Sequence, residues 1–100
     1  MQNEYSLHFL PSAARQLAKL PRPARLKVGD AFDPRARQPR ARSAKLLAGT
    51  GDERIWRIAV GDHRILYEVL DDRLVVLGIR VANRREAYGR ALRRLLKELP

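Results

Sequence analysis

Apolar and polar residues alternate along several short stretches of this chain. The alternation has a period of two, which is typical of β-strands with one buried face. In residues 55–60, Trp56, Ile58 and Val60 fall on one face, which we expect to pack against a helix. Residues 74–81 are almost wholly apolar and predict a central strand buried on both faces. In chain order, the predicted strands are residues 4–9, 44–47, 55–60, 64–69 and 74–81.

Apolar residues at helical spacing predict two helices between the first two strands. Pro11 suits the first turn of one helix, and Pro21 and Pro23 separate it from the next. The second helix is expected to end at Asp33, because a residue before proline avoids helical geometry. The expected apolar positions are Ala14, Leu17 and Leu20 on the first helix and Leu26, Val28, Ala31 and Phe32 on the second.

The last part of the chain predicts one more helix and completes the fold class. Its apolar spacing involves Tyr88, Leu92, Leu95 and Leu99. Tight turns are expected at residues 49–51, 61–62 and 71–72. We therefore expect a single α+β domain over residues 1–100. It should hold a small, mainly antiparallel sheet of four to five strands, with two N-terminal helices and a C-terminal helix on one face.

The charge of the chain points to a polyanionic partner. Lysine and arginine number 21 against 11 acidic residues, which gives a formal net charge of +10. Such a balance favours nucleic acid. Seventeen of the basic residues are arginine, whose planar guanidinium suits phosphate, although the codon bias of a GC-rich genome would give the same excess. Residues 33–43 hold arginine, proline and polar residues with almost nothing to bury, which predicts an exposed basic loop.

Other classes of site find little support in the sequence. The chain has no cysteine, so it has no disulfide and no thiol nucleophile. The pairs Asp52-Glu53 and Asp71-Asp72 stand at turns where adjacent side chains diverge, so we expect solvated turn residues and no metal site. There is no signal-peptide pattern and no apolar run near the roughly 20 residues of a membrane span. We expect a soluble, cytoplasmic protein without membrane association.

Four segments, in order and at the usual spacing, resemble the RelE/ParE superfamily of bacterial toxins from type II toxin–antitoxin systems. They are FLPSAARQLAKLPRPAR, AKLLAG, IWRIAVGDHRILYEV and VVLGIRVANRREAYGR. The resemblance covers nearly the whole chain. Its RelE branch implies an endoribonuclease that enters the ribosomal A site and cuts the exposed mRNA codon. The implied chemistry is attack of the ribose 2′-hydroxyl on the adjacent phosphate, without metal or cofactor, and the implied partner is a cognate antitoxin.

The resemblance also implies catalytic residues, namely Arg57, Arg64, Arg84 and Tyr88. Internal cleavage of RNA needs a base for the 2′-hydroxyl and stabilisation of the developing negative charge, which clustered arginines supply. A tyrosine serves as the base only where neighbouring positive charges favour its phenolate. His63 is a second possible base. Ordinary packing of Tyr88 on the sheet and simple surface charge at the arginines are the alternatives.

The sequence departs from the family pattern at three positions near these residues. Ala59 replaces a lysine that assists the reaction in some family members, Asn83 replaces a frequent His or Lys, and His63 replaces a frequent tyrosine. These departures leave two other functions open. One is a ParE-like toxin that inhibits DNA gyrase without cutting RNA, and the other is a degenerate toxin that only binds its antitoxin.

Basic residues outside this set are candidates for contact with ribosomal RNA. We expect them in the basic loop at residues 35–45, on the outer face of the last helix, and at Arg80 and Arg85 around the end of the last strand. The candidates are Arg37, Arg40, Arg42, Lys45, Arg80 and Arg85.

Overall fold

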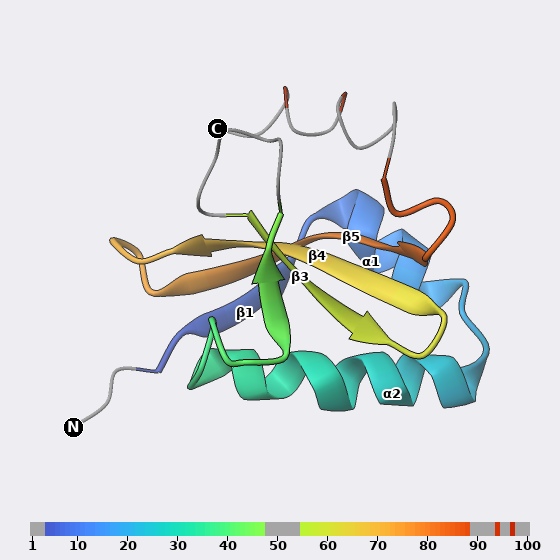
Figure 1. Ribbon diagram of the computed structural model, residues 1–100, viewed down its shortest axis with the longest axis horizontal. Coiled ribbons are helices and arrows are strands. Elements are labelled where there is room, and N and C mark those ends of the chain that lie inside the picture. The colour runs from blue at the N-terminus through green and yellow to red at the C-terminus, as the bar shows by residue number, and fades with distance from the viewer. Residues whose placement is uncertain (1–3, 48–54, 89–93, 95–96, 98–100) are drawn as a thin grey trace.

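The computed structural model describes residues 4–47 and 55–88, together with Arg94 and Lys97 (Figure 1). The elements in chain order are β1 (Ser6–Phe9), α1 (Pro11–Ala18), α2 (Arg22–Phe32), the 3-10 helix η1 (Asp33–Ala36), β2 (Ala44–Leu46), β3 (Ile55–Val60), β4 (His63–Leu70) and β5 (Val75–Asn83). The strands form one five-stranded sheet in the order β1-β5-β4-β3-β2. All pairs are antiparallel except β1 with β5. The predicted α+β class, the two N-terminal helices and the mainly antiparallel sheet are confirmed.

The expected C-terminal helix lies almost entirely outside the described residues, and no such helix is among the described elements. Tyr88 does not begin a helix, because Ala87 and Tyr88 form an irregular bend after β5. Arg94 and Lys97 are individually helical and exposed. The turn expected at residues 49–51 also lies outside the described part. Within that part, no helix has the length and apolar character needed to cross a membrane.

The larger core cluster lies between the sheet and the two helices (Figure 1). Phe32 of α2 is its aromatic centre, with its ring centroid 4.7 Å from that of Phe9 and 6.0 Å from that of Tyr67. Full burial of one such side chain contributes about 1.5–3 kcal/mol, so this layer supplies much of the fold's stability. Trp56 packs against the same cluster, as its place in the alternation predicts.

The helices present slightly different faces from those expected. On α1 the buried position is Ala13, whereas Ala14 is exposed. Ala13 shares a helical face with Leu17, and the neighbouring Ala14 is turned about 100° away. On α2, Leu26 is 57% exposed, because it stands about 200° around the helix from the buried Val28. Both expected positions, Ala14 and Leu26, were therefore wrong.

α1 also completes the edge of β5. β1 pairs with β5 only as far as Gly78. Beyond that point the side chain of Gln16 on α1 accepts a hydrogen bond from the backbone N–H of Val81 at 2.8 Å. The helix thus covers a strand edge that would otherwise expose unpaired backbone groups.

The opposite face of the sheet carries a second, smaller cluster that includes Ile55, Leu66 and Ile79. Its composition depends on a β-bulge. The pairing of β4 with β5 places Leu66 opposite Arg80 but Tyr67 opposite Gly78, so Ile79 has no partner on β4. Ile79 and Arg80 consequently both belong to this face, although strict alternation would place them on opposite sides.

Residues 33–43 are largely exposed, as their composition predicts, but they begin with the short helix η1 and are anchored to the sheet. The hydroxyl of Tyr67, buried in the core, donates a hydrogen bond to the Pro39 carbonyl at 2.5 Å. Burial raises the pKa of Tyr67, and the guanidinium of Arg35 opposes that shift. Arg35 is itself only 6% exposed, and its Nη1 lies 3.4 Å from the Ser43 hydroxyl. The segment is therefore anchored from inside.

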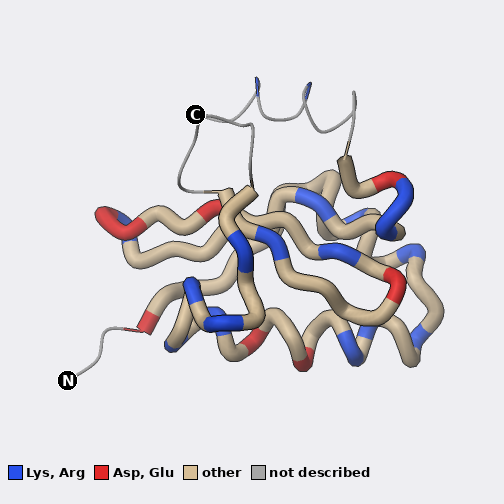
Figure 2. Tube along the Cα trace, in the orientation of Figure 1, with Lys and Arg blue, Asp and Glu red and all other residues tan. Residues whose placement is uncertain are grey.

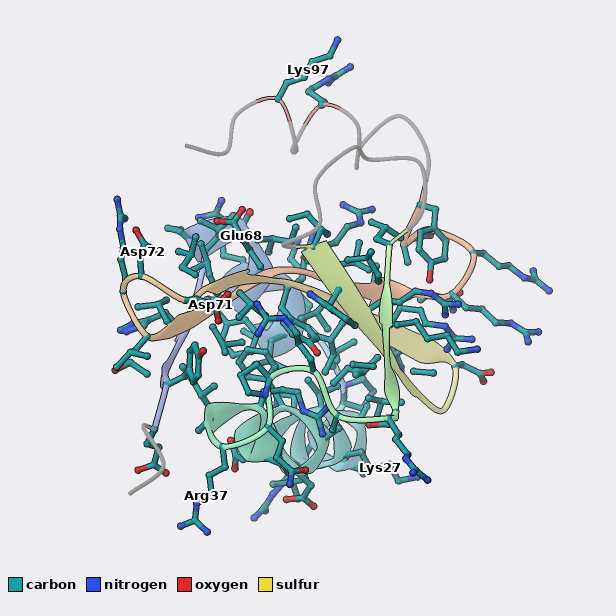
Figure 3. All side chains as sticks on the ribbon, turned by 60° about the vertical axis from the view of Figure 1, so that its left-hand side comes forward. Lys27, Arg37, Glu68, Asp71, Asp72 and Lys97 are labelled. Carbon is teal, nitrogen blue, oxygen red and sulfur yellow. The ribbon has the colours of Figure 1, made fainter. Side chains whose placement is uncertain are left out.

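A second anchor holds the same segment from outside. The guanidinium of Arg40 donates to both carboxylate oxygens of Asp71, at 3.1 and 2.5 Å, and lies 5.9 Å from the ring centroid of Trp56. The Tyr5 hydroxyl donates to Asp71 as well, at 2.6 Å. Asp71 lies in the turn between β4 and β5 (Figure 3). It accepts hydrogen bonds from both Arg40 and Tyr5, so it is not the freely solvated turn residue that we expected.

Substitution of Gly78 tests how tightly β5 packs against Phe9 of β1. A Cβ at this position would lie 2.6 Å from Phe9 Cε1 and closer still to Cδ1. Gly78→Ala should therefore lower the free energy of unfolding by about 1–3 kcal/mol through overpacking, as measured by urea denaturation. Gly29→Ala is the matched control, because nothing lies within 4 Å of its Cβ, and it should stabilise α2 by about 0.5–1 kcal/mol. If Gly78→Ala and Gly29→Ala changed the free energy of unfolding equally, the close packing of Gly78 against Phe9 would be contradicted.

Asp71 predicts a pH dependence of stability. Hydrogen bonds from Arg40, and then from Tyr5, hold the pKa of Asp71 below its ordinary value of 3.8. Stabilisation by this group is therefore complete above the unfolded pKa and is lost as the pH falls through the lower folded pKa. Both partners are partly exposed, so Asp71→Asn should cost only about 0.5–1 kcal/mol at pH 7. Urea denaturation should show that the difference from wild type vanishes below the pKa of Asp71. Asp72→Asn, the control, should leave the free energy of unfolding unchanged both at pH 7 and below the pKa of Asp71.

Candidate functional site

An open hollow on the second face of the sheet gathers arginines from separate parts of the chain. Its volume is about 570 Å³, within the range of about 300–1,000 Å³ typical of ligand sites. The described residues that line it are Leu46, Leu47, Arg57, Arg64, Arg84, Arg85 and Tyr88. The structure thus brings together all four residues that the resemblance implied as catalytic, and adds Arg85, which had been expected to contact RNA.

Strand register explains how β3 and β4 contribute to the hollow. Arg57 stands opposite Leu66, and Arg64 stands opposite Ala59, so both arginines share the face of the smaller core cluster. Lys45 on β2 pairs with Arg57 and extends the basic row to the sheet edge. Figure 2 shows the resulting basic positions on β2, β3 and β4 and on the turn that follows β5.

The tip of the β3–β4 hairpin orients Arg64. Gly61 adopts a positive φ of 59°, which the tight turn requires and glycine tolerates best. Nη1 of Arg64 donates to the Gly61 carbonyl at 3.0 Å and to the His63 carbonyl at 2.9 Å. These bonds hold the guanidinium close to the turn beside the hollow.

The chain after β5 is joined to the same hairpin tip. The backbone N–H of Arg84 donates to the carbonyl oxygen of Asp62 at 2.8 Å. His63 pairs across the sheet with Asn83. Arg84 is therefore held next to the turn that orients Arg64, although the two are distant in sequence.

Asn83 organises the turn that carries Arg84 and Arg85. Its side-chain oxygen accepts the Arg85 N–H, and its carbonyl accepts the N–H groups of Glu86 and Ala87, all at 2.9 Å. This is the local hydrogen bonding for which asparagine is favoured in turns. Sequence reasoning treated Asn83 only as a departure from the family pattern, whereas an asparagine at the end of a strand was a signal for this turn-capping role.

Arg80 supports the same turn from the sheet. Its Nη2 donates to the Glu86 carbonyl at 2.6 Å. Its side chain is half-buried, and Arg80 is not among the described residues that line the hollow. Of the six expected RNA-contacting residues, Arg85 is therefore the one that lines the hollow, and Arg80 is not.

The hollow combines positive charge with exposed apolar surface. Four guanidinium groups line it, and none of the described lining residues is acidic. Tyr88 is 39% exposed and Leu46 is 44% exposed, two of the three exposed large apolar side chains among the described residues. An anionic ligand with flat apolar parts fits this arrangement best.

The remaining predicted residues lie elsewhere. His63 lines a different hollow near Pro21 and Lys27, so it is not placed beside Tyr88. Arg40 is bound to Asp71, and Arg37 forms an exposed ion pair with Glu4 at 3.5 Å.

Figure 3 shows Arg37 on the α2 side of the sheet, away from the buried Glu68 on the other side. Arg42 is exposed beside β2 in a further shallow hollow.

Among the described residues, no group of three or more His, Asp or Glu side chains is placed to hold a metal ion.

Comparison with known proteins identifies the family. Residues 7–88 match the family described as the ParE toxin of the type II toxin–antitoxin system parDE. No protein of curated function matches the chain significantly in sequence.

Several solved structures share the fold. In the toxin–antitoxin complex RelBE2 from Mycobacterium tuberculosis, the match has 29% identity, covers 86% of this chain and 98% of that one, and has a TM-score of 0.70. The isolated E. coli RelE toxin matches at 30% identity over 91% of this chain and 98% of that one, with a TM-score of 0.65. A mutant of E. coli RelE in the free state matches at 26% identity over 91% and 97%, with a TM-score of 0.73. From the family match and these structures together, the chain belongs to the RelE/ParE superfamily of type II toxin–antitoxin toxins.

Proposed function

We propose that this toxin is a ribosome-dependent endoribonuclease that cuts mRNA, with Arg57, Arg64, Arg84 and Tyr88 as its catalytic residues. The observation that carries the proposal is the hollow itself, where these side chains meet with no described carboxylate among them. A cluster of guanidinium groups beside a phenol suits a phosphodiester that must be held and polarised.

The proposed reaction is an internal transfer within the RNA. The ribose 2′-oxygen attacks the adjacent phosphorus, and the proton of the 2′-hydroxyl passes to Tyr88, which acts in the phenolate form that neighbouring guanidinium groups favour. The bond from phosphorus to the 5′-oxygen breaks, and the leaving oxygen takes a proton from water in the open hollow. The hydroxide left behind takes the proton back from Tyr88. The products are a 2′,3′-cyclic phosphate and a 5′-hydroxyl. The guanidinium groups stabilise the extra negative charge on the pentacoordinate phosphorus, which is the largest electrostatic demand of the step.

The shape of the hollow supports a single-stranded substrate. Duplex RNA hides its base faces, whereas an unstacked base can lie on exposed apolar and aromatic side chains. Leu46 and Tyr88 offer such surfaces beside the arginines. A codon exposed on the ribosome is a substrate of this kind, and Lys45 and Arg42 would approach neighbouring phosphates.

Inhibition of DNA gyrase is the second candidate function, and two observations favour it. The matching family is that of the ParE toxins. Ala59, opposite Arg64, brings no functional group to the place where some ribonucleases of the superfamily have a lysine. In this alternative the basic hollow binds its target without chemistry.

A cognate antitoxin is the proposed protein partner. Related structures contain toxin and antitoxin together, including RelBE2 and the intact E. coli RelBE complex. The formal charge of +10 favours an antitoxin segment rich in acidic residues.

Mapping of mRNA 5′-ends after induced expression distinguishes these functions. Wild type should produce new cuts in translated messages. Tyr88→Phe should slow cleavage by about 10²–10⁴-fold through loss of the base. Arg84→Ala should also abolish visible cuts, whereas the control Arg73→Ala, far from the hollow, should cut normally. Growth arrest without cuts, together with loss of DNA supercoiling, would favour gyrase instead.

Charge reversal tests the approach to ribosomal RNA. Lys45→Glu and Arg42→Glu should weaken ribosome binding and lower its dependence on salt, because each lost phosphate contact reduces the slope of log affinity against log salt by about 0.7–0.9. Arg40 is unsuitable for this test, since its reversal would break the contact with Asp71. Arg22→Glu on α2 is the control. Binding by sedimentation that is unchanged in Lys45→Glu and Arg42→Glu would contradict the proposed approach.

A further inference from the structure

Arg80 belongs to the hollow's face of the sheet only because of the β-bulge. Strict alternation from Leu77 would direct its side chain toward the larger core cluster on the other face of the sheet, but the register shift pairs Arg80 with Leu66. Bulges commonly redirect one side chain next to a functional site. Here the redirected guanidinium comes within reach of the chain that follows β5.

The guanidinium of Arg80 binds this backbone and is partly enclosed. Nη2 donates to the Glu86 carbonyl at 2.6 Å, and Nε is buried with no hydrogen-bond partner. Exposed arginines such as Arg84 and Arg85, by contrast, line the hollow. Arg64 also bonds backbone carbonyls, but it lines the hollow, whereas Arg80 does not and has a buried Nε. This difference indicates an internal role for Arg80.

The Glu86 carbonyl that Arg80 binds lies in the turn that leads to Tyr88. The near end of the turn is held by Asn83 and by the bond from Arg84 N–H to the Asp62 carbonyl. At the far end, the Glu86 carbonyl is held by the side chain of Arg80, and the N–H groups of Glu86 and Ala87 are held by the backbone carbonyl of Asn83. The fully buried Ala87 is followed directly by Tyr88. Among the described side chains, Arg80 is thus the one that fixes the turn nearest to Tyr88.

We propose that Arg80 is a positioning residue of the ribonuclease, which holds the turn so that Tyr88 and Arg84 face the hollow. This inference rests on the function proposed above and replaces the RNA contact that the sequence suggested for Arg80. Arg80 touches neither the substrate nor the reacting atoms and acts through the backbone of Glu86. Its loss should therefore affect the chemical step and leave RNA affinity intact.

Single-turnover cleavage on ribosomes programmed with a defined mRNA separates the two roles. Arg80→Lys keeps the charge but not the planar fork, and Arg80→Gln removes both. Both variants should lower the maximal rate by about 10–100-fold, since a misplacement of about 1 Å can have an effect of this size. The half-saturating toxin concentration and its salt dependence should stay at wild-type values. Arg73→Gln, an exposed arginine in the β4–β5 turn, is the matched control and should cut normally.

A contact with RNA predicts a different pattern. Arg80→Lys would then behave as wild type, and Arg80→Gln would raise the half-saturating concentration and reduce the salt dependence. That pattern would overturn the proposal. Coupling to Tyr88 is a further check: adding Arg80→Lys to Tyr88→Phe should lower the rate less than Arg80→Lys lowers it in the wild type, because part of the effect acts through Tyr88. Fully multiplicative losses would also overturn it.

A structural measurement keeps this inference separate from the ribonuclease itself. Hydrogen exchange at the amides of Glu86 and Ala87, followed by NMR on the full chain, should be faster in Arg80→Lys and Arg80→Gln than in Arg73→Gln. If wild type cuts no mRNA, the proposed function fails, while this exchange still decides whether Arg80 holds the turn. Unchanged exchange in Arg80→Lys, which keeps the charge and is the safer variant for folding, would overturn the role of Arg80.

Discussion

The register of β5 on β4, with its single shift between Leu66 and Tyr67, determines where the arginine hollow can form. Without the bulge, every side chain of β5 after Ile79 would change faces, and Val81 would leave the core. With it, Val81 stays buried, Arg80 turns to the hollow's face, and the chain leaves the sheet beside the β3–β4 hairpin tip. The bonds from Arg84 to Asp62 and from Arg80 to Glu86 both depend on that exit.

Two sets of described arginines differ in their surroundings. Arg40 and Arg37 lie on acidic partners, Asp71 and Glu4, and the contact of Arg40 anchors the segment that precedes β2. The arginines at the hollow share it with no described acidic lining residue, and their mutual repulsion opposes folding. A sheet buried on both faces supplies the stability that lets such a cluster persist. Uncompensated charge of this kind is what a polyanionic ligand neutralises on binding.

Local patterns in the sequence were enough to predict most of the fold. Alternation and helical spacing depend on near neighbours, and they placed five strands and two helices close to where the structure has them. Composition predicted that residues 33–43 are exposed but not that they are anchored, because the anchoring depends on Tyr67 and Asp71, which are distant in sequence. The bulge at Ile79 was equally invisible, because it is a property of two paired strands.

The meeting of Arg57, Arg64, Arg84 and Tyr88 was anticipated through the family resemblance, while the supporting roles of Asn83 and Arg80 were not. The central claim is that the hollow promotes attack by the ribose 2′-hydroxyl. The most direct test uses purified toxin and programmed ribosomes, with a single 2′-deoxy substitution at the scissile nucleotide. Our account predicts cleavage of the unmodified mRNA to a 2′,3′-cyclic phosphate and no cleavage of the substituted one. Equal cleavage of both, or none of either, would contradict it.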